Sequence, residues 1–198
     1  ALMALMARPI TRSRAVSVAA PETIAALDGG ARADAIAACR RVTDAVYAGL
    51  DVTEEIDAVE RRGLGDTVLV RDGDDVVALA VCHVGTGSEA GGGACLVKFA
   101  AVRPEAASQQ TFDRLLDACD ALAAARGAGV LLVGVDPGTR AAYRHVLARG
   151  FRTQMQGVGM ERVTVFGAGG AGSAVAAALA DLGAGEISIV DHDEARAR

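Results

Sequence analysis

The amino-acid sequence predicts an α/β fold in which helices flank a mixed, twisted β-sheet. Short apolar runs of strand length, bounded by turn residues, alternate with longer runs whose apolar residues recur every three or four positions. A strand, a glycine-rich turn, a helix and a second strand also follow one another between Val163 and Asp191. We therefore expect a disordered leader over residues 1–14, a main body over residues 15–160 and a βαβ unit over residues 161–198.

Composition excludes several classes of partner. The chain has 198 residues, a formal net charge of −5 and no dense cluster of Lys and Arg, so we expect no nucleic-acid partner. Its apolar runs are too short to span a bilayer, and no membrane partner is expected. The four cysteines form no C-x-x-C pair and lie in apolar runs, which favours free thiols in the cytoplasm and predicts no metal site.

Helical spacing dominates the first third of the chain, after a short strand predicted around Val16 and Val18. Apolar residues at steps of three and four predict a buried helix face over residues 31–50. A short surface helix is expected over residues 51–63, because this segment starts with capping residues, carries its acids early and its arginines late, and stops at a glycine.

Strands dominate the middle of the body. Residues 67–84 form two apolar runs around Asp72-Gly73, which is the strongest hairpin signal in the sequence. A third strand is expected over residues 95–102, and an amphipathic helix follows it and ends at Gly127. The body then ends with a buried strand over residues 130–135, a helix over 139–149 and a strand over 151–160.

Three landmarks in this order carry a family resemblance: the hairpin "VLVRDGDDVVALAVCHVG", the strand "KFAAVRP" running into "FDRLLDACDALAAARG", and "AAYRHVLARGFRTQMQGVGM". With them, residues 50–160 resemble a GNAT N-acetyltransferase domain. The resemblance implies transfer of an acetyl group from acetyl-CoA to an amine. It also implies that the pantetheine arm pairs with exposed backbone of one central strand, here Lys98, Phe99, Ala100, Ala101 and Val102.

The pyrophosphate loop departs from the family pattern. That pattern, Q/R-x-x-G-x-G/A, uses glycines so that backbone N–H groups can close on phosphate at a helix N-terminus. This chain has Ala107 to Phe112 in that place, without a glycine. The resemblance therefore leaves the helix dipole, the side chains of Ser108, Gln109 and Gln110, and nearby Arg103 to meet the pyrophosphate.

Catalytic residues are less well defined by the sequence. In the family, a tyrosine that protonates the departing thiolate often lies four residues before the "GF" of the last helix; this position is Val146, and Tyr143 lies one turn earlier. Tyr143 is thus a candidate acid, with a buried tyrosine whose hydroxyl is satisfied as the alternative. His83 and Glu89 are candidate bases, with a structural histidine and a solvated loop charge as the alternatives.

The C-terminal segment carries a dinucleotide-binding pattern. A strand is followed by glycines in G-x-G-x-x-G spacing, an Ala-rich helix and a second strand that ends at Asp191. It is similar to the cofactor-binding start of shikimate and quinate dehydrogenases, and the acid would favour NAD over NADP by repelling a 2′-phosphate. The turn residues assigned to NAD are Gly167, Ala168, Gly169, Gly170, Ala171 and Gly172.

Three functions are compatible with these patterns. The favoured one is a GNAT-like acetyltransferase, and the second is a partial Rossmann unit that binds NAD(P). The third is a catalytically inactive chimera, in which Val163 to Phe166 completes the edge of the body sheet. The dehydrogenase family also uses a catalytic lysine. The only lysine in this chain is Lys98, on a strand expected to be buried, so no residue here is assigned the role of that catalytic lysine.

Overall fold

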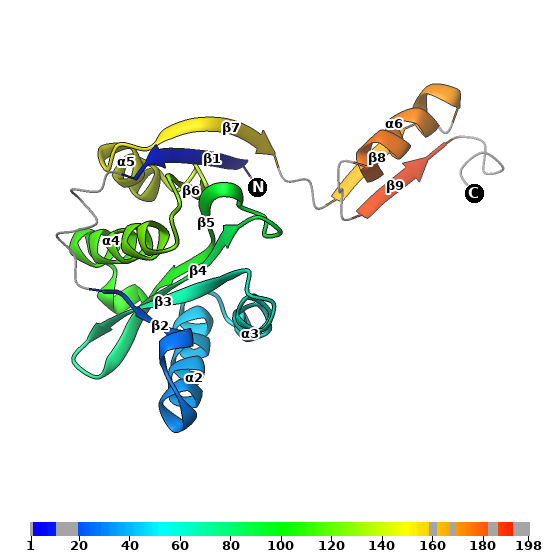
Figure 1. Ribbon diagram of the computed structural model, residues 1–198. Helices are drawn as coiled ribbons and strands as arrows, with labels where there is room; N and C mark the ends of the chain where they lie inside the picture. The colour runs from blue at the N-terminus through cyan, green and yellow to red at the C-terminus, as the bar shows by residue number, and fades with distance from the viewer. Residues whose placement is uncertain (1, 11–19, 159–161, 167–168, 182–185, 192–198) are drawn as a thin grey trace.

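The computed structural model describes residues 2–10, 20–158, 162–166, 169–181 and 186–191. Its strands form two separate sheets, one of seven strands in the body and one of two strands near the C-terminus (Figure 1). The α/β class and the mixed, helix-flanked sheet are as the sequence predicted. In the described part of the chain, no helix is long and apolar enough to cross a membrane.

The body sheet has the strand order β2-β3-β4-β5-β6-β1-β7. Only the β5–β6 pair is parallel among the neighbours of this sheet, and the others are antiparallel. The strands are β1 (Leu2–Pro9), β2 (Glu22–Thr23), β3 (Gly65–Asp72), β4 (Asp75–Gly85), β5 (Gly91–Val102), β6 (Val130–Val135) and β7 (Arg152–Val158). The helices are α2 (Gly29–Val46), α3 (Thr53–Arg61), α4 (Gln109–Ala125) and α5 (Arg140–Ala148), with 3-10 turns at Ile24–Ala26 and Pro104–Ala106.

The hairpin predicted at Asp72-Gly73 joins β3 and β4. Asp72 pairs with Asp75, so Gly73 and Asp74 form a two-residue loop. Gly73 has a φ of 58°, whereas no residue other than glycine has a positive φ in the described chain. A left-handed residue only at the first loop position is typical of a type II′ turn, whose twist matches that of the flanking strands.

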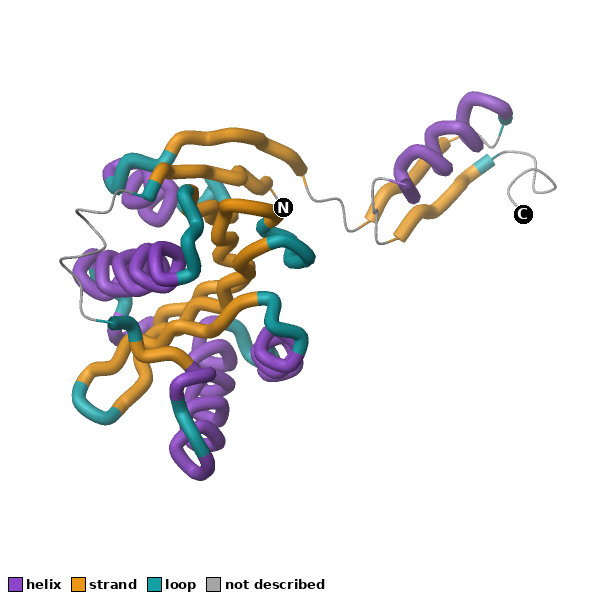
Figure 2. The backbone as a smooth tube through the Cα atoms, in the orientation of Figure 1, coloured by secondary structure: helices purple, strands orange, loops and turns teal. Residues whose placement is uncertain are grey.

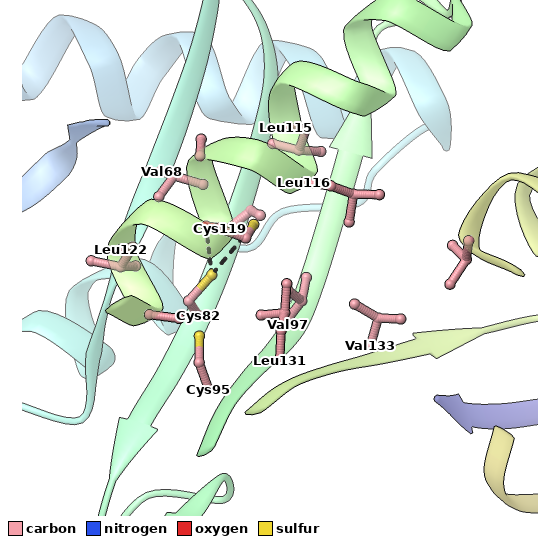
Figure 3. Close-up of a cluster of buried hydrophobic side chains, with 14 of the residues drawn as sticks. Val68, Cys82, Cys95, Val97, Leu115, Leu116, Cys119, Leu122, Leu131 and Val133 are labelled. Atoms are coloured by element: carbon pink, nitrogen blue, oxygen red, sulfur yellow. Dashed lines mark hydrogen bonds between the residues drawn. The ribbon is translucent and has the colours of Figure 1, made fainter. Parts of the chain in front are cut away.

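Helices cover both faces of the body sheet (Figure 2). One apolar core lies between the sheet and α4, and the other between the sheet and the α2–α3 pair. Figure 3 shows the first of these cores, in which the sulfur atoms of Cys82 and Cys119 lie 3.8 Å apart and Cys95 lies nearby. Hydrogen bonding to Cys119 and Cys95, together with burial, raises the pKa of the Cys82 thiol, so these cysteines act as small apolar side chains.

The N-terminal segment is a strand of the sheet, so the prediction of a disordered leader is wrong for residues 2–9. Strand β1 inserts between β6 and β7 and pairs antiparallel with both. Ala4 and Met6 are completely buried. Arg8 is also buried, and it pairs with Asp120 of α4, a contact that local sequence pattern does not indicate. The strand predicted around Val16 and Val18 lies outside the described residues.

The C-terminal unit contains β8 (Arg162–Phe166), α6 (Gly170–Asp181) and β9 (Glu186–Val190). Strands β8 and β9 run parallel, with Val163 opposite Ile187 and Val165 opposite Ile189. This is the βαβ order that the glycine pattern predicted. The alternative in which residues 163–166 complete the edge of the body sheet is wrong, because the edges of that sheet are β2 and β7 and β8 pairs with β9.

Candidate functional site

The two central strands of the body separate part-way along their length. Strands β5 and β6 pair in parallel from Ala94–Val130 to Val97–Val133, and the described pairing stops there although both strands continue. At the same point β5 has a bulge, because Val97 pairs with Cys82 and Phe99 pairs with Val81, which leaves Lys98 as an extra residue. The bulge and the end of pairing create a local opening in the sheet.

Backbone groups of β5 face this opening. The N–H of Arg103 donates to the carbonyl of Val77 on β4, at 2.8 Å. Because N–H groups point alternately to the two sides of a strand, those of Val102 and Ala100 point away from β4 and toward the gap. A ligand lying along residues 98–102 would therefore meet backbone donors and acceptors without displacing a sheet partner.

A pocket of about 240 Å³ lies at the opening. Ala100 and Val102 line it from β5, Val133 and Val135 from β6, and helices α4 and α5 close it. Its lining is mostly apolar, with a few polar groups, as is usual for small-molecule sites. The remaining lining residues include Val97, Phe112, Leu115, Leu116, Asp136, Thr139, Ala142, His145 and Val146.

A second pocket, of about 520 Å³, extends the first toward the N-terminus of α4. The two share Phe112, Ala142 and His145 as lining residues, so they adjoin each other between α4 and α5, and together we call them the groove. Ser108 and Gln109 line the far end, together with Arg144 from α5. The groove thus runs from an apolar opening in the sheet to a helix N-terminus beside a cation, which is an environment suited to an anion.

The first turn of α4 is built by its capping residue. The Ser108 hydroxyl accepts from the Thr111 N–H at 3.1 Å and lies 2.9 Å from the Thr111 hydroxyl. Ser108 and Gln109 line the groove, whereas Gln110 lines a different pocket, together with Ser108, Asp72 and Arg114. Arg103 also lies elsewhere, because its guanidinium donates to the carbonyl of Val76 at 2.9 Å.

On the opposite face of the sheet, four polar residues come together from α3, β4, the loop after β4, and β5. Glu55 Oε1 lies 3.0 Å from His83 Nε2 and 3.0 Å from Lys98 Nζ, and Lys98 also pairs with Glu89. His83 is buried with 3% of its side chain exposed, whereas Glu89 is exposed. Lys98 lies on the strand that was expected to be buried, but its side chain is 25% exposed, and its Nζ lies 5.9 Å from the centre of the Phe99 ring.

Tyr143 does not line either part of the groove. Its hydroxyl lies 3.3 Å from that of Thr153 on β7, and its ring packs against the α4-side core. His145, on the same helix, lines both pockets instead. Its Nε2 lies 3.1 Å from Asp113 Oδ1 on α4. Sequence analysis missed His145, although it directly precedes Val146, the position at which the family tyrosine was sought.

Several solved structures resemble this chain. An acetyltransferase of the GNAT family from Novosphingobium aromaticivorans has a TM-score of 0.50 at 17% identity, over 79% of this chain and 62% of that one. A GNAT acetyltransferase from Colwellia psychrerythraea has a TM-score of 0.55 at 11% identity, over 78% of this chain and 53% of that one. The body has the GNAT fold. A GCN5-related N-acetyltransferase from Sphaerobacter thermophilus has a TM-score of 0.50 at 17% identity, over 78% of this chain and 49% of that one.

The match covers only part of each of these three proteins. The chain spans between 49% and 62% of their length. No curated protein matches the chain. With a GNAT fold in the body, the opening between β5 and β6 is the place where the sequence resemblance puts the pantetheine arm.

One family model matches the end of the chain, from α5 onward. The model of the ThiF family matches residues 144–196, about a quarter of the chain, and this range contains β8, α6 and β9. Gly169 precedes α6 and its carbonyl accepts from the Ser173 N–H at 2.9 Å, while Gly170, Ala171 and Gly172 form the first turn of that helix. Gly167 and Ala168 lie outside the described residues. Asp191 directly follows β9, as predicted.

Proposed function

We propose that the body transfers an acetyl group from acetyl-CoA to an amine. The observation that carries this proposal is the end of β5–β6 pairing at Val97–Val133, with an apolar pocket directly at the opening. An extended amide-containing arm could take the place of the missing strand partner and bond to the N–H groups of Ala100 and Val102. The GNAT fold of the body supports this use of the opening.

The groove supplies a second contact region for the cofactor. Its outer end holds the Ser108 cap, Gln109 and Arg144 beside the positive end of the α4 dipole. These groups can replace the missing glycine loop as an anion site, with fewer backbone N–H donors in reach. We expect them to meet the pyrophosphate of acetyl-CoA, as the sequence resemblance implies for Ser108 and Gln109.

The candidate acid changes in the light of the geometry. Tyr143 would have to turn its hydroxyl away from Thr153 to reach the groove, whereas His145 already lines it and is held by Asp113. Of the two, His145 is therefore the better candidate acid, because it lines both pockets of the groove. Among the candidate bases, Glu89 pairs with Lys98 and His83 pairs with Glu55, and neither lines the groove.

Thermal unfolding with added ligand tests this proposal. A ligand that binds only the folded state raises the unfolding temperature, and a ligand at a hundred times its dissociation constant adds about 2.7 kcal/mol. We expect millimolar acetyl-CoA to raise the Tm of the wild-type chain. Val102→Pro removes one backbone donor in the opening and should abolish that increase, while Val102→Ala, which keeps the N–H, should retain it. Equal increases for both variants would contradict the pantetheine assignment.

A second candidate function is nucleotide binding by the C-terminal unit. The ThiF match and the βαβ order of residues 162–190 favour it. Asp191 at the end of the second strand led us to expect NAD as the ligand, and binding of NAD stays a prediction. The same unfolding measurement separates the two functions, because a Tm increase with NAD and none with acetyl-CoA would favour the nucleotide unit and contradict the acyl-transfer proposal.

A further inference from the structure

The turn before α4 uses its own backbone donors. The N–H groups of Ala106 and Ala107 donate to the carbonyls of Arg103 and Pro104, at 3.0 Å and 3.2 Å, and a proline has no N–H to offer. These bonds close the 3-10 turn at Pro104–Ala106 and direct the donors into the turn. The turn therefore presents fewer N–H groups to a phosphate chain than a glycine loop, whose donors face the ligand.

The first turn of α4 offers only a small anion site. The first four N–H groups of a helix have no partner within the helix. In α4 the N–H of Thr111 already donates to the Ser108 hydroxyl at 3.1 Å, which leaves those of Ser108, Gln109 and Gln110. So few donors suit one phosphate group. They do not suit the diphosphate and the further 3′-phosphate of coenzyme A together.

The outer surface of α5 is positively charged. Arg140 and Arg144 lie one turn apart on this helix, and both side chains are exposed. Neither forms an ion pair in the part of the chain that the structure describes, because the acids of α4 that reach α5 pair with His145 and Arg149 instead. Helix α5 itself contains no acidic residue. It is thus a positive patch on a chain whose formal net charge is −5.

The groove opens to solvent beside this positive surface. Arg144 lines the outer pocket together with Ala141 and Ala148, and all three are exposed. Arg140 lines neither pocket and so lies outside the groove. A ligand that fills the groove from the opening between β5 and β6 therefore leaves the protein at a rim that carries positive charge.

We propose that the groove also accepts an acyl thioester on the 4′-phosphopantetheine arm of an acidic carrier protein. This inference rests on the proposed acetyl transfer. The arm contains the same amide chain as coenzyme A, so it meets the same backbone N–H groups of Ala100 and Val102. It carries one phosphodiester, which matches the small anion site at Gln109, and the acidic surface of the carrier then faces Arg140 and Arg144.

The distribution of charge favours a carrier protein over free coenzyme A as the better donor. In coenzyme A, the second phosphate and the phosphorylated ribose continue beyond the first phosphate, where the turn before α4 has already used its donors. A carrier protein has its acidic side chains outside the groove, at the rim where Arg140 and Arg144 lie. Charges at the rim of an interface mainly raise the association rate and select the partner.

The reaction on the carrier makes and breaks the same bonds as with coenzyme A. The amine nitrogen forms a C–N bond to the thioester carbonyl carbon, and the C–S bond breaks with its electron pair on the sulfur of the arm. One proton leaves the amine for solvent, and one proton from solvent neutralises the thiolate. The products are an acetylated amine and a carrier protein with a free thiol on its arm, and no oxidant is consumed.

Calorimetric binding to a panel of acidic acyl carrier proteins tests the proposal without turnover. We expect a holo carrier, which bears the arm, to bind at least about tenfold more tightly than its apo form and than free 4′-phosphopantetheine. Arg140→Glu should weaken binding of the holo carrier about tenfold and leave binding of free 4′-phosphopantetheine unchanged. The matched control is Arg41→Glu, which makes the same change of charge at an exposed arginine of α2, on the other face of the sheet, and should leave both unchanged.

Two binding results would overturn the proposal. One is binding of free 4′-phosphopantetheine without tighter binding of any holo carrier in the panel, and the other is an equal loss for Arg140→Glu and Arg41→Glu. If neither acetyl-CoA nor 4′-phosphopantetheine binds, the proposed function fails instead.

Donor kinetics then separate the two sources of the arm. Thiol release is measured with a panel of small primary amines as acceptors. We expect kcat/KM for the acetylated carrier to exceed that for S-acetyl-4′-phosphopantetheine at least about tenfold, with a smaller difference at high salt. Transfer from acetyl-CoA and none from any carrier would overturn this inference and leave the proposed function standing.

Discussion

Gly65 is the residue whose identity is most strictly required by its surroundings. It lies opposite His83 in the β3–β4 pair, and a Cβ atom built on it would lie 1.8 Å from the carbonyl oxygen of Cys82. No side chain can be accommodated there unless the two strands move apart. The close approach of β3 therefore fixes the backbone that carries His83.

We predict that Gly65→Ala destabilises the chain by about 1–3 kcal/mol, because the added methyl group overpacks the strand pair. The control is Gly30→Ala, since a Cβ at Gly30 meets no atom within 4 Å and its φ is not positive. That substitution should be neutral or stabilise the helix by up to about 1 kcal/mol. Urea unfolding followed by circular dichroism measures both, and equal stabilities of the two variants would contradict the crowding at Gly65.

At the scale of elements, one buried ion pair fixes β1 within the sheet. The Arg8 guanidinium pairs with Asp120 of α4, donates to the Arg149 carbonyl at 2.9 Å, and lies 4.5 Å from the centre of the Phe151 ring. Both side chains of the pair are about 95% buried, at 6% and 5% exposure. The pair thus joins the N-terminal strand to α4 and to the end of α5.

We predict that Asp120→Ala destabilises the protein by about 3–5 kcal/mol, because it leaves the Arg8 charge buried without its counterion. The double substitution Arg8→Met with Asp120→Leu should cost less, since it removes both charges and keeps apolar volume. Chemical unfolding of the two variants provides the comparison. A double variant less stable than Asp120→Ala would mean that the pair itself, and not the unpaired charge, dominates the stability.

At the scale of the whole molecule, folding buries all four cysteines. Burial raises the pKa of the Cys39 thiol to about 12, so the folded state holds this proton more tightly than the unfolded chain, where the thiol titrates near 9. A group whose pKa is raised on folding contributes stability that is complete below the unfolded pKa and is lost as pH rises through the folded one. The Cys39 contribution is therefore present below about pH 9.

We predict that the free energy of unfolding falls between about pH 9 and 12, by up to about 1.4 kcal/mol per pH unit from Cys39. Cys39→Val should be the matched control, because it keeps an apolar side chain but has no proton to lose. Its stability should decline less steeply over this range in urea titrations. The same slope in both proteins would show that other groups cause the alkaline decline.

Local pattern in the sequence predicted most elements from α2 onward, the β3–β4 hairpin and the βαβ order of the C-terminal unit, although the loop of the hairpin is Gly73-Asp74, one residue later than predicted. Periodicity and turn chemistry are local, because they follow from the backbone geometry of a few adjacent residues. The resemblance of the body to a GNAT domain could also be predicted from the sequence, since it rests on the order of those elements. His83 could be selected as a titratable residue on an apolar strand.

Tertiary structure alone decided where β1 lies and which side chains meet. Arg8 and Asp120 are far apart in the sequence, as are Glu55, His83 and Lys98, and each set meets only when strands pair in one register and helices pack on one face. The same holds for His145 and Asp113, which sit on different helices beside the groove. Local pattern could not predict these contacts, because long-range pairing is determined by the packing of the whole sheet.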